Sequence, residues 1–190
     1  MAAVHGLRRA VAAGARVFLR PPSAADAQEF CATMHASRRH FARWGHPPYS
    51  AAAFARWLRN ARPSHTRRFL ICRRADGAIM GQVSLGNIVR GLFQSAYTGY
   101  YLARRFTGQG YMTEALQLVL RHAFRDLRLH RVEANIQPEN ARSLALVRRC
   151  GFRREGVSPR MLKMGGRWRD HERWTILVDD WRSGRRRGRR

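Results

Sequence analysis

The sequence predicts a mixed α/β domain (α+β), built on a mostly antiparallel sheet with helices on both faces. Three short strand-like runs follow one another with turns between them. A strand-like run then leads through a glycine turn into a strongly amphipathic helix, and further strand-like runs follow that helix. Because the chain has 190 residues, of which 45% are hydrophobic, we expect one domain with a continuous core.

The successive strands are predicted at Phe69–Arg73, Ala78–Ile88 and Ala96–Leu102. Turn signals at Asp76-Gly77 and Arg90-Gly91 separate them. Strands joined by short turns pair as neighbours, so these three favour an antiparallel meander.

The N-terminal part adds one strand and two helices to this meander. Val17–Arg20 is predicted as the first strand, and Ser23 caps a helix that runs to about Met34. Segment 43–48 contains two prolines, which withhold amide donors, so a loop is expected there. Ala51–Arg59 is predicted as a second helix.

The C-terminal part begins with the central helix, because apolar residues recur at helical spacing from Met112 to Leu127. The later elements are a strand at Val132–Ile136, a helix from Ala141 to Arg149 with Asn140 as N-cap and Gly151 as its stop, and a closing hairpin of Met161–Met164 and Arg173–Val178 around Gly165-Gly166.

The cysteine content bears on the cellular compartment and on whether the protein has disulfides or bound metal. The three cysteines, Cys31, Cys72 and Cys150, lack the spacing of metal ligands. An odd number of cysteines without a signal sequence suits a reducing cytoplasm. We therefore expect a cytoplasmic protein with no disulfide and no metal.

The formal net charge of +25 is carried almost entirely by arginine, because Lys163 is the only lysine. The arginine-rich run at 182–190 has no apolar periodicity, which predicts a disordered basic tail. Such a tail would attract RNA phosphates, although a solvated tail with no partner fits the same composition. A flexible extension is expected at 1–15, the domain at 16–181, and no run reaches the length of a membrane span.

The loop before the central helix has the composition of an anion site. It contains Arg105, Thr107, Gly108, Gln109 and Gly110. Glycines let the backbone approach a ligand, and the unpaired amides of the first helical turn, near Tyr111, face any anion at that end. An ordinary turn fits this short string too, but the order of strand, loop and helix favours the pyrophosphate of a cofactor.

This order of elements, with the arginine-glycine loop and the asparagine-capped helix after the next strand, resembles the Gcn5-related N-acetyltransferase (GNAT) superfamily. Segments 87–91, 108–110 and 166–171 are similar to the ribosomal-protein-alanine N-acetyltransferases. The resemblance covers 17–181. It implies the GNAT acyl-CoA N-acyltransferase fold and an acetyl-CoA site on the arginine-glycine loop. It also implies that Tyr101 and Leu102 lie beside the pantetheine arm, which Asn140 contacts as well.

The resemblance further implies transfer of an acetyl group to the N-terminal α-amine, of alanine or serine, of a ribosomal protein. Ribosomal RNA is then a second partner for the basic tail. A small amine or another protein remains an alternative acceptor. A third alternative is a non-enzymatic module that binds ribosomes or RNA.

Acid and base candidates come from the same resemblance. Glu133 aligns with a glutamate that some members use as base, although an exposed carboxylate on an outward strand position fits equally. A tyrosine that often protonates the thiolate is replaced here by Val147. Ser143, three residues after Asn140, is the hydroxyl that could take over this role, and it also suits ordinary capping.

The acceptor is expected opposite the cofactor, between the loop at Trp44 and the segment Trp168–His171, which includes Asp170. Few acidic residues are available to attract a polycationic small molecule. The same positive charge repels a basic ribosomal protein unless RNA mediates the contact.

Overall fold

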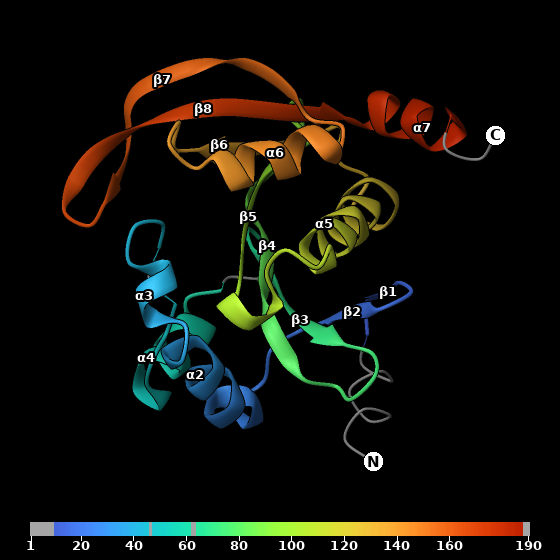
Figure 1. Cartoon of the computed structure of the whole chain (residues 1–190). Coiled ribbons are helices and arrows are strands. Elements are labelled where there is room, and N and C mark those ends of the chain that lie inside the picture. Colours follow the sequence, from blue (N-terminus) through green and yellow to red (C-terminus); the bar gives the residue numbers. More distant parts are fainter. Residues whose placement is uncertain (1–9, 46, 62–63, 188–190) are drawn as a thin grey trace.

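The computed structural model describes residues 10–45, 47–61 and 64–187. Within these ranges eight strands form one sheet, in the order β1-β2-β3-β4-β5-β6-β8-β7 (Figure 1). The strands are β1 (Ala12–Ala13), β2 (Val17–Arg20), β3 (Arg67–Arg73), β4 (Ile79–Val89), β5 (Ser95–Leu102), β6 (Arg131–Ile136), β7 (Arg153–Met164) and β8 (Arg167–Leu177). The helices are η1 (Ala24–Asp26), α2 (Ala27–His35), α3 (Arg38–Phe41), α4 (Ala51–Arg59), η2 (Arg104–Phe106), α5 (Tyr111–Arg121), the π-helical turn η3 (His122–Asp126), α6 (Ala141–Arg149) and α7 (Val178–Arg187).

The pairing of β5 with β6 sets the shape of the sheet. Every other neighbouring pair is antiparallel, whereas β5 and β6 run parallel. Their pairing covers only three residues on each strand, Ser95–Tyr97 against Arg131–Glu133. Beyond this point the two strands diverge. The predicted fold, a mostly antiparallel mixed sheet flanked by helices, is confirmed.

The two faces of the sheet carry different helices (Figure 1). Tyr100 and Tyr101 are consecutive on β5, so their side chains point to opposite faces. The Tyr101 ring lies 5.6 Å from the Phe41 ring of α3, and the Tyr100 hydroxyl lies 2.7 Å from Ser143 of α6. The first face therefore meets α3, and the second meets α6.

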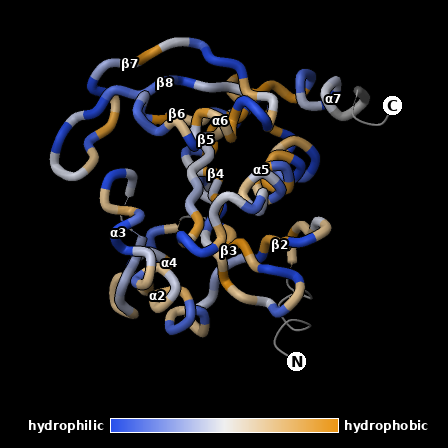
Figure 2. The backbone as a smooth tube through the Cα atoms, in the orientation of Figure 1, coloured by the Kyte–Doolittle hydropathy of each residue, from blue (hydrophilic) through white to orange (hydrophobic). Residues whose placement is uncertain are grey.

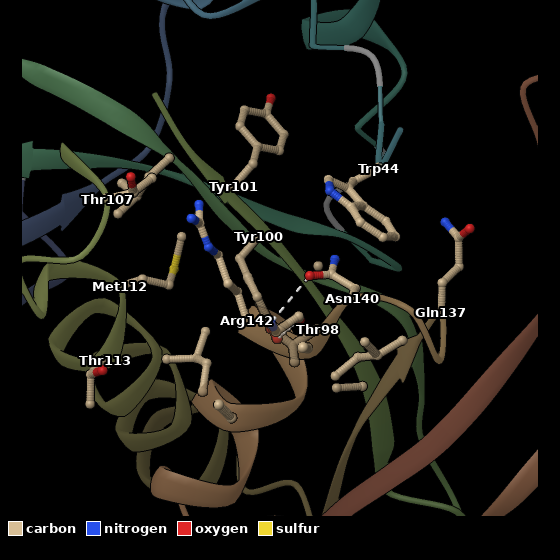
Figure 3. A pocket seen from close by; sticks show the side chains of 18 of the residues that line it. Trp44, Thr98, Tyr100, Tyr101, Thr107, Met112, Thr113, Gln137, Asn140 and Arg142 are labelled. Carbon is tan, nitrogen blue, oxygen red and sulfur yellow. Dashed lines mark hydrogen bonds between the residues drawn. The ribbon is translucent and has the colours of Figure 1, made fainter. Parts of the chain in front are cut away.

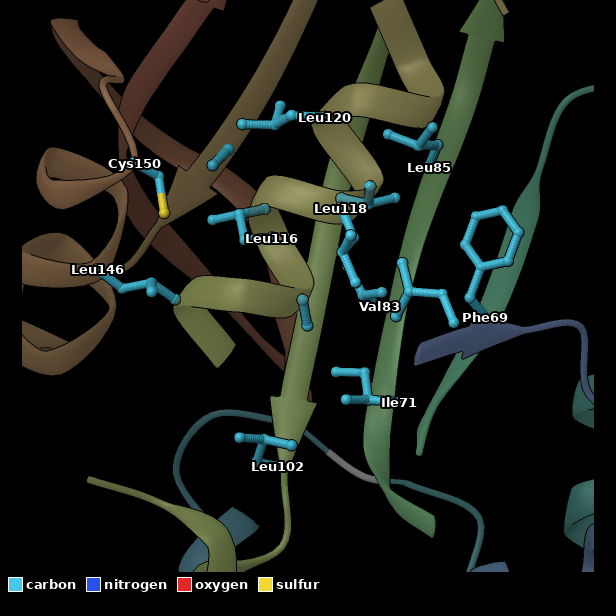
Figure 4. Packing of buried hydrophobic residues seen from close by; sticks show 14 of the residues in the cluster. Phe69, Ile71, Val83, Leu85, Leu102, Leu116, Leu118, Leu120, Leu146 and Cys150 are labelled. Carbon is cyan, nitrogen blue, oxygen red and sulfur yellow. The ribbon is translucent and has the colours of Figure 1, made fainter. Parts of the chain in front are cut away.

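The core between α5 and the sheet explains the regular apolar spacing of that helix. Leu116 and Leu120 are fully buried, and Leu118 of the same helix points toward Val83 and Leu85 of β4 (Figure 4). The tube coloured by hydropathy shows the same apolar stretch on α5, while β7 and α7 are mostly hydrophilic (Figure 2). Burial of such side chains supplies about 1.5–3 kcal/mol each, which holds α5 and its N-terminus against the sheet.

Two predictions about the ends of the domain differ in part from the structure. The predicted flexible extension at 1–15 includes β1, which pairs with β2 because Val11 and Gly14 donate backbone hydrogen bonds to Leu19 and Val17, both at 2.8 Å. Residues 1–9 lie outside the described ranges. The predicted disordered tail at 182–190 is helical as far as Arg187, since Trp181 anchors α7 with its ring 5.5 Å from that of Phe124. Residues 188–190 are outside the described ranges.

The closing hairpin is longer than predicted. The predicted segments Met161–Met164 and Arg173–Val178 are the ends of β7, with 12 residues, and β8, with 11, except that Val178 begins α7. A register shift between Ser158 and Leu162, with Arg160 at a φ of 48°, interrupts the alternation that would reveal a long strand. No described helix combines the length and hydrophobicity that crossing a membrane requires.

Gly81 allows β4 and β5 to approach closely where the cavity described below opens. A Cβ atom at Gly81 would lie 2.1 Å from the Tyr101 carbonyl oxygen and 2.9 Å from the Leu102 Cα. These are backbone atoms, so Gly81→Ala should destabilise the fold by about 2 kcal/mol and lower the Tm by about 4–8 °C. Gly86→Ala, on the same strand with nothing within 4 Å, is the matched control and should change the Tm little. Thermal unfolding followed by circular dichroism measures both, and equal Tm values for the two variants would contradict this packing.

Candidate functional site

A cavity of about 1300 Å³ occupies the wedge between β5 and β6. Its lining comes from β4, β5 and β6, from α3, from the N-terminal ends of α5 and α6, and from the β7–β8 hairpin (Figure 3). Because Tyr100 and Tyr101 both line it, the cavity reaches both faces of the sheet at the point where β5 loses its partner. Two ligands can therefore meet there from opposite sides.

The glycine loop forms one end of the cavity, as predicted. Thr107, Gly108, Gly110 and Tyr111 line it, and the two glycines have φ values of 78° and 80°. The Glu114 amide donates to the Gly110 carbonyl at 3.2 Å, so the amides of 111–113 precede the first α-helical bond. Amides at a helix N-terminus attract an anion. The residues present thus fit a phosphate group.

Two predicted loop residues do not reach the cavity. The Arg105 guanidinium stacks on the Phe106 ring, 4.7 Å from its centroid. The Gln109 side chain donates to the Arg105 carbonyl at 2.9 Å, so both residues shape the loop from outside. The arginines that line the cavity are Arg142 and Arg149 of α6, which the sequence analysis missed. Only the packing of α6 beside the wedge reveals them.

Tyr101, Leu102 and Asn140 all line the cavity. β5 has no β6 partner beyond Tyr97, so its backbone there is available to a ligand. The Asn140 side chain accepts a hydrogen bond from the Ser143 amide at 3.2 Å, which confirms Asn140 as the N-cap of α6. The cap places the first turn of α6 at the cavity wall.

Ser143 lines the cavity and shares a 2.7 Å hydrogen bond with the Tyr100 hydroxyl. Burial raises the pKa of Tyr100 to about 12, although the hydrogen bond to Ser143 acts in the opposite direction. Both hydroxyls therefore carry their protons at neutral pH. Val147 is fully buried in the core, and the tyrosine that contacts Ser143 comes from β5. No sequence pattern links Tyr100 to Ser143.

Glu133 is not among the residues that line the cavity. Its carboxylate lies 2.8 Å from the Arg131 Nε, and Arg131 also binds Glu155 of β7. The hydrogen bonds that Arg131 donates to Glu155 and Glu133 are the main reason that its pKa is raised. This network ties β6 to β7. Glu133 is thus neither in the cavity lining nor the exposed carboxylate of the alternative, because its side chain is only 15% exposed and is paired with Arg131.

His171 is only 2% exposed and lines the cavity, whereas its neighbours in sequence do not. Its Nδ1 lies 3.0 Å from the Arg169 carbonyl oxygen. A carbonyl only accepts, so this contact assigns the proton to Nδ1 and leaves the Nε2 lone pair free. The Asp170 carboxylate accepts a hydrogen bond from the Arg160 amide at 2.7 Å, and Trp168 is 59% exposed. Both lie outside the cavity lining.

Trp44 lines the cavity, and α3 adds His40, which no sequence pattern indicated. Burial lowers the pKa of His40, and the nearby charges of Arg104 and Arg142 lower it further. His40 is therefore neutral at pH 7. Among the described residues that line the cavity, Glu139 is the only carboxylate, so this site offers little to a polycation.

Several polar atoms in the cavity wall have no hydrogen-bond partner among the described residues. They include Gln82 Nε2, Tyr101 OH and Asn135 Oδ1. An unsatisfied buried polar group costs about 1–3 kcal/mol, so such a group calls for an explanation. Gln82 pairs with Tyr101 in the β4–β5 register, which puts both side chains on the face that meets α3. A polar ligand on this face would satisfy them.

No group of three or more histidine, cysteine, aspartate or glutamate side chains suited to a metal ion occurs within the described ranges. The described site is built from hydroxyls, amides and arginines.

Comparisons with known proteins agree with this geometry. The family model of the acetyltransferase (GNAT) domain matches residues 16–153. The chain is 41% identical over 112 residues to the probable N-acetyltransferase YjcK of Bacillus subtilis, a match that covers 59% of this chain and 62% of that protein. It is 39% identical over 107 residues to the ribosomal protein uS5-alanine N-acetyltransferase of Escherichia coli, over 56% of this chain and 55% of that protein. The chain thus spans less than two thirds of the length of either relative.

A solved structure is similar over a larger share of the chain. RimJ of Mycobacterium smegmatis in complex with CoA-disulfide has a TM-score of 0.80 and 32% identity, and the match covers 86% of this chain and 83% of that chain.

Gly108 offers a test of the anion site. Gly108→Leu and its matched control Gly91→Leu both place a side chain at a positive φ, 78° and 64°, with nothing within 4 Å of the added Cβ. Each should cost about 1–2 kcal/mol of stability from the left-handed backbone. Only Gly108→Leu fills the cavity, so it alone should weaken coenzyme A binding, by about tenfold or more in Kd. Calorimetric titration measures this, and unchanged affinity in Gly108→Leu would remove the glycine loop from the ligand site.

Proposed function

The chain belongs to the GNAT acetyltransferase family, and we propose that it transfers an acetyl group from acetyl-CoA to the N-terminal α-amine of a protein, with alanine or serine first. A ribosomal protein is the proposed acceptor. The observation that carries this proposal is the cavity through the sheet, with an anion-binding helix end on one side and unpaired polar side chains on the other.

The residues on the α5 and α6 side fit acetyl-CoA. The amides of 111–113, next to Gly108 and Gly110, would hold the pyrophosphate, and Arg142 and Arg149 would add positive charge. The β5 backbone from residue 98 to Leu102, which has no β6 partner, would bind the pantetheine arm, beside Asn140. When bound, acetyl-CoA supplies the activated acetyl group as a thioester.

The other face fits a peptide better than a polyamine. Gln82, Tyr101 and Asn135 present unpaired donors and acceptors, which suit the amide groups of an extended chain. A single carboxylate, Glu139, lines the whole cavity, so a polycation would find little attraction. A protein α-amine has a reference pKa of about 7.7–8.0, so a sizeable fraction is already neutral at pH 7 and needs modest help from a base.

His171 is the base that we assign to this reaction, in place of Glu133. Its free Nε2 can accept the amine proton, while the Arg169 carbonyl holds Nδ1–H. As the amine nitrogen bonds to the carbonyl carbon and the carbon–sulfur bond breaks, His171 takes one proton and the thiolate needs another. Glu133 instead keeps Arg131 in place between β6 and β7.

Ser143 is the proposed donor of the second proton, and Tyr100 its partner. The Tyr100 hydroxyl can donate to Ser143 as Ser143 donates to the thiolate, because the two oxygens lie 2.7 Å apart. The pKa of Tyr100, raised to about 12 by burial, keeps this hydroxyl protonated between turnovers. Two hydroxyls in series thus replace one tyrosine on α6.

Proton donation from Tyr100 through Ser143 to the thiolate predicts the effects of two substitutions. Ser143→Ala removes the proton donor and should lower kcat by about a hundredfold, with the KM for acetyl-CoA little changed. Tyr100→Phe leaves Ser143 in place and should lower kcat less. The double variant should be no slower than Ser143→Ala, because both hydroxyls act in one step. Steady-state kinetics measure all three, and costs that multiply in the double variant would contradict a shared step.

Intact mass spectrometry tests the proposed acceptor. The protein is incubated with acetyl-CoA and either purified ribosomal proteins, a peptide that begins with alanine, the same peptide with a blocked N-terminus, or spermidine. We expect one acetyl group on a ribosomal protein and on the free peptide, and none on the blocked peptide. Preferred transfer to spermidine would support a small-amine acceptor instead, and no transfer to any acceptor would support a non-enzymatic module.

A further inference from the structure

The β7–β8 hairpin extends beyond the rest of the sheet (Figure 1). β8 pairs with β6 only from Glu172 to Leu177, so its residues 167–171 pair with β7 alone. We call residues 160–169 the hairpin tip. In the register of the tip, Leu162 lies opposite Arg169, and Lys163 opposite Trp168. The tip is therefore a two-stranded ribbon, whose residues are exposed except for the half-buried Met161 and Met164.

The hairpin tip carries four cations and no carboxylate. The cations are Arg160, Lys163, Arg167 and Arg169, and all are exposed. No hydrogen bond or ion pair holds any of these four side chains in the part of the chain that the structure describes. The nearest carboxylate in sequence, Asp170, accepts from the Arg160 backbone amide instead.

The base of the same hairpin is different. Arg154 pairs with Glu172 at 3.0 Å, and Arg153 with Asp180 at 3.1 Å. Carboxylates thus neutralise the arginines where β7 packs on the body, and they are missing from the tip. Neighbouring like charges on a ribbon repel each other, so a polyanion that bridges them would be attracted.

An aromatic side chain lies among these cations. Trp168 is 59% exposed and directly opposite Lys163, so its ring is next to a positive charge on the same face. Leu162 is 41% exposed as well. Cations spaced along a ribbon match the phosphates of a nucleic-acid backbone, and an exposed indole gives an unpaired base a surface for stacking. A lipid surface would match the charges but would not need stacking.

We propose that the hairpin tip binds single-stranded RNA, with Lys163, Arg167 and Arg169 neutralising phosphates and Trp168 stacking on a base. The surface goes beyond the acetyl-transfer proposal and does not depend on it. Met164 of the tip and His171, two residues after the tip, line the cavity. RNA on the tip would therefore lie beside the acceptor side, and it would offset the repulsion between this enzyme and a basic acceptor protein.

Fluorescence anisotropy with a labelled oligouridine of about 20 nucleotides tests this surface, without acetyl-CoA. The triple variant Lys163→Gln, Arg167→Gln, Arg169→Gln should bind about tenfold more weakly, and its slope of log K against log salt should fall by about 2. The matched control Arg56→Gln, Arg59→Gln, Arg128→Gln removes the same charge from exposed positions elsewhere, and should lose about threefold or less. Equal losses in the two triple variants would overturn the assignment, because binding would then follow total charge.

Trp168→Leu separates stacking from charge. It should weaken oligouridine binding by about fivefold with the salt slope unchanged. No loss with Trp168→Leu, or equal binding of a duplex RNA of the same length, would overturn the single-stranded assignment. Phosphatidylserine vesicles are the second probe: if the hairpin triple variant loses vesicle binding but keeps oligouridine binding, the surface is a lipid site and the proposal fails. Acetyl transfer is measured separately in the Trp168→Leu variant. The RNA-binding proposal is tested by oligouridine affinity and the acetyl-transfer proposal by activity, so one can fail without the other.

Discussion

The divergence of β5 from β6 after three paired residues is the constraint on which the rest of the site depends. Close contact between Gly81 and the Tyr101 carbonyl keeps the end of β5 on β4, while β6 stays paired with β8 along its whole length. β5 therefore follows β4 and β6 follows β8, so the two strands separate. Unpaired backbone in a sheet needs a partner, and the wedge provides room for one. Packing of the buried face of α5 holds the N-terminus of this helix at one end of the wedge. The proposed anion site therefore lies next to the part of β5 that has no β6 partner.

Two consecutive residues of β5 point to opposite faces of the sheet, and the two proposed proton transfers take place on these two faces. Tyr100 reaches Ser143 on the α6 side, where the thiolate would leave, and Tyr101 reaches Phe41 on the side where the acceptor would enter. A β-strand makes this division without a loop, because its side chains alternate. His171 completes the acceptor side from β8. The groups that would donate and accept protons thus lie on strands and a capped helix, which hold them more rigidly than a loop would.

The distribution of charge follows from the scarcity of carboxylates, 12 against 37 lysines and arginines. Many described carboxylates serve the fold. Asp26 binds Arg20 through two hydrogen bonds, at 2.9 and 2.6 Å. Burial raises the pKa of Asp26, but the hydrogen bonds from Arg20 and Ser23 outweigh it and lower the pKa overall. This pair stabilises the fold above the ordinary aspartate pKa, and the contribution is lost as the pH falls through the lowered value. With carboxylates used in this way, the cavity and the hairpin tip are left cationic.

The sequence by itself determined the elements whose physics is local. The apolar spacing of α5, the Asn140 cap of α6 and the glycines of the anion loop depend on residues within one or two turns, so the strand, loop and helix order and the cofactor end could be predicted. The proposed acid and base depend on contacts that appear only in the folded chain. Tyr100 and Ser143 are 43 residues apart, and the free Nε2 of His171 depends on a carbonyl and a strand register. Glu133 is a base candidate in the sequence because the resemblance aligns it with a glutamate that some members use as base; its pairing with Arg131, which also binds Glu155, depends on strand pairing. Strand pairing joins distant residues, and no short sequence pattern records which of them it will bring together.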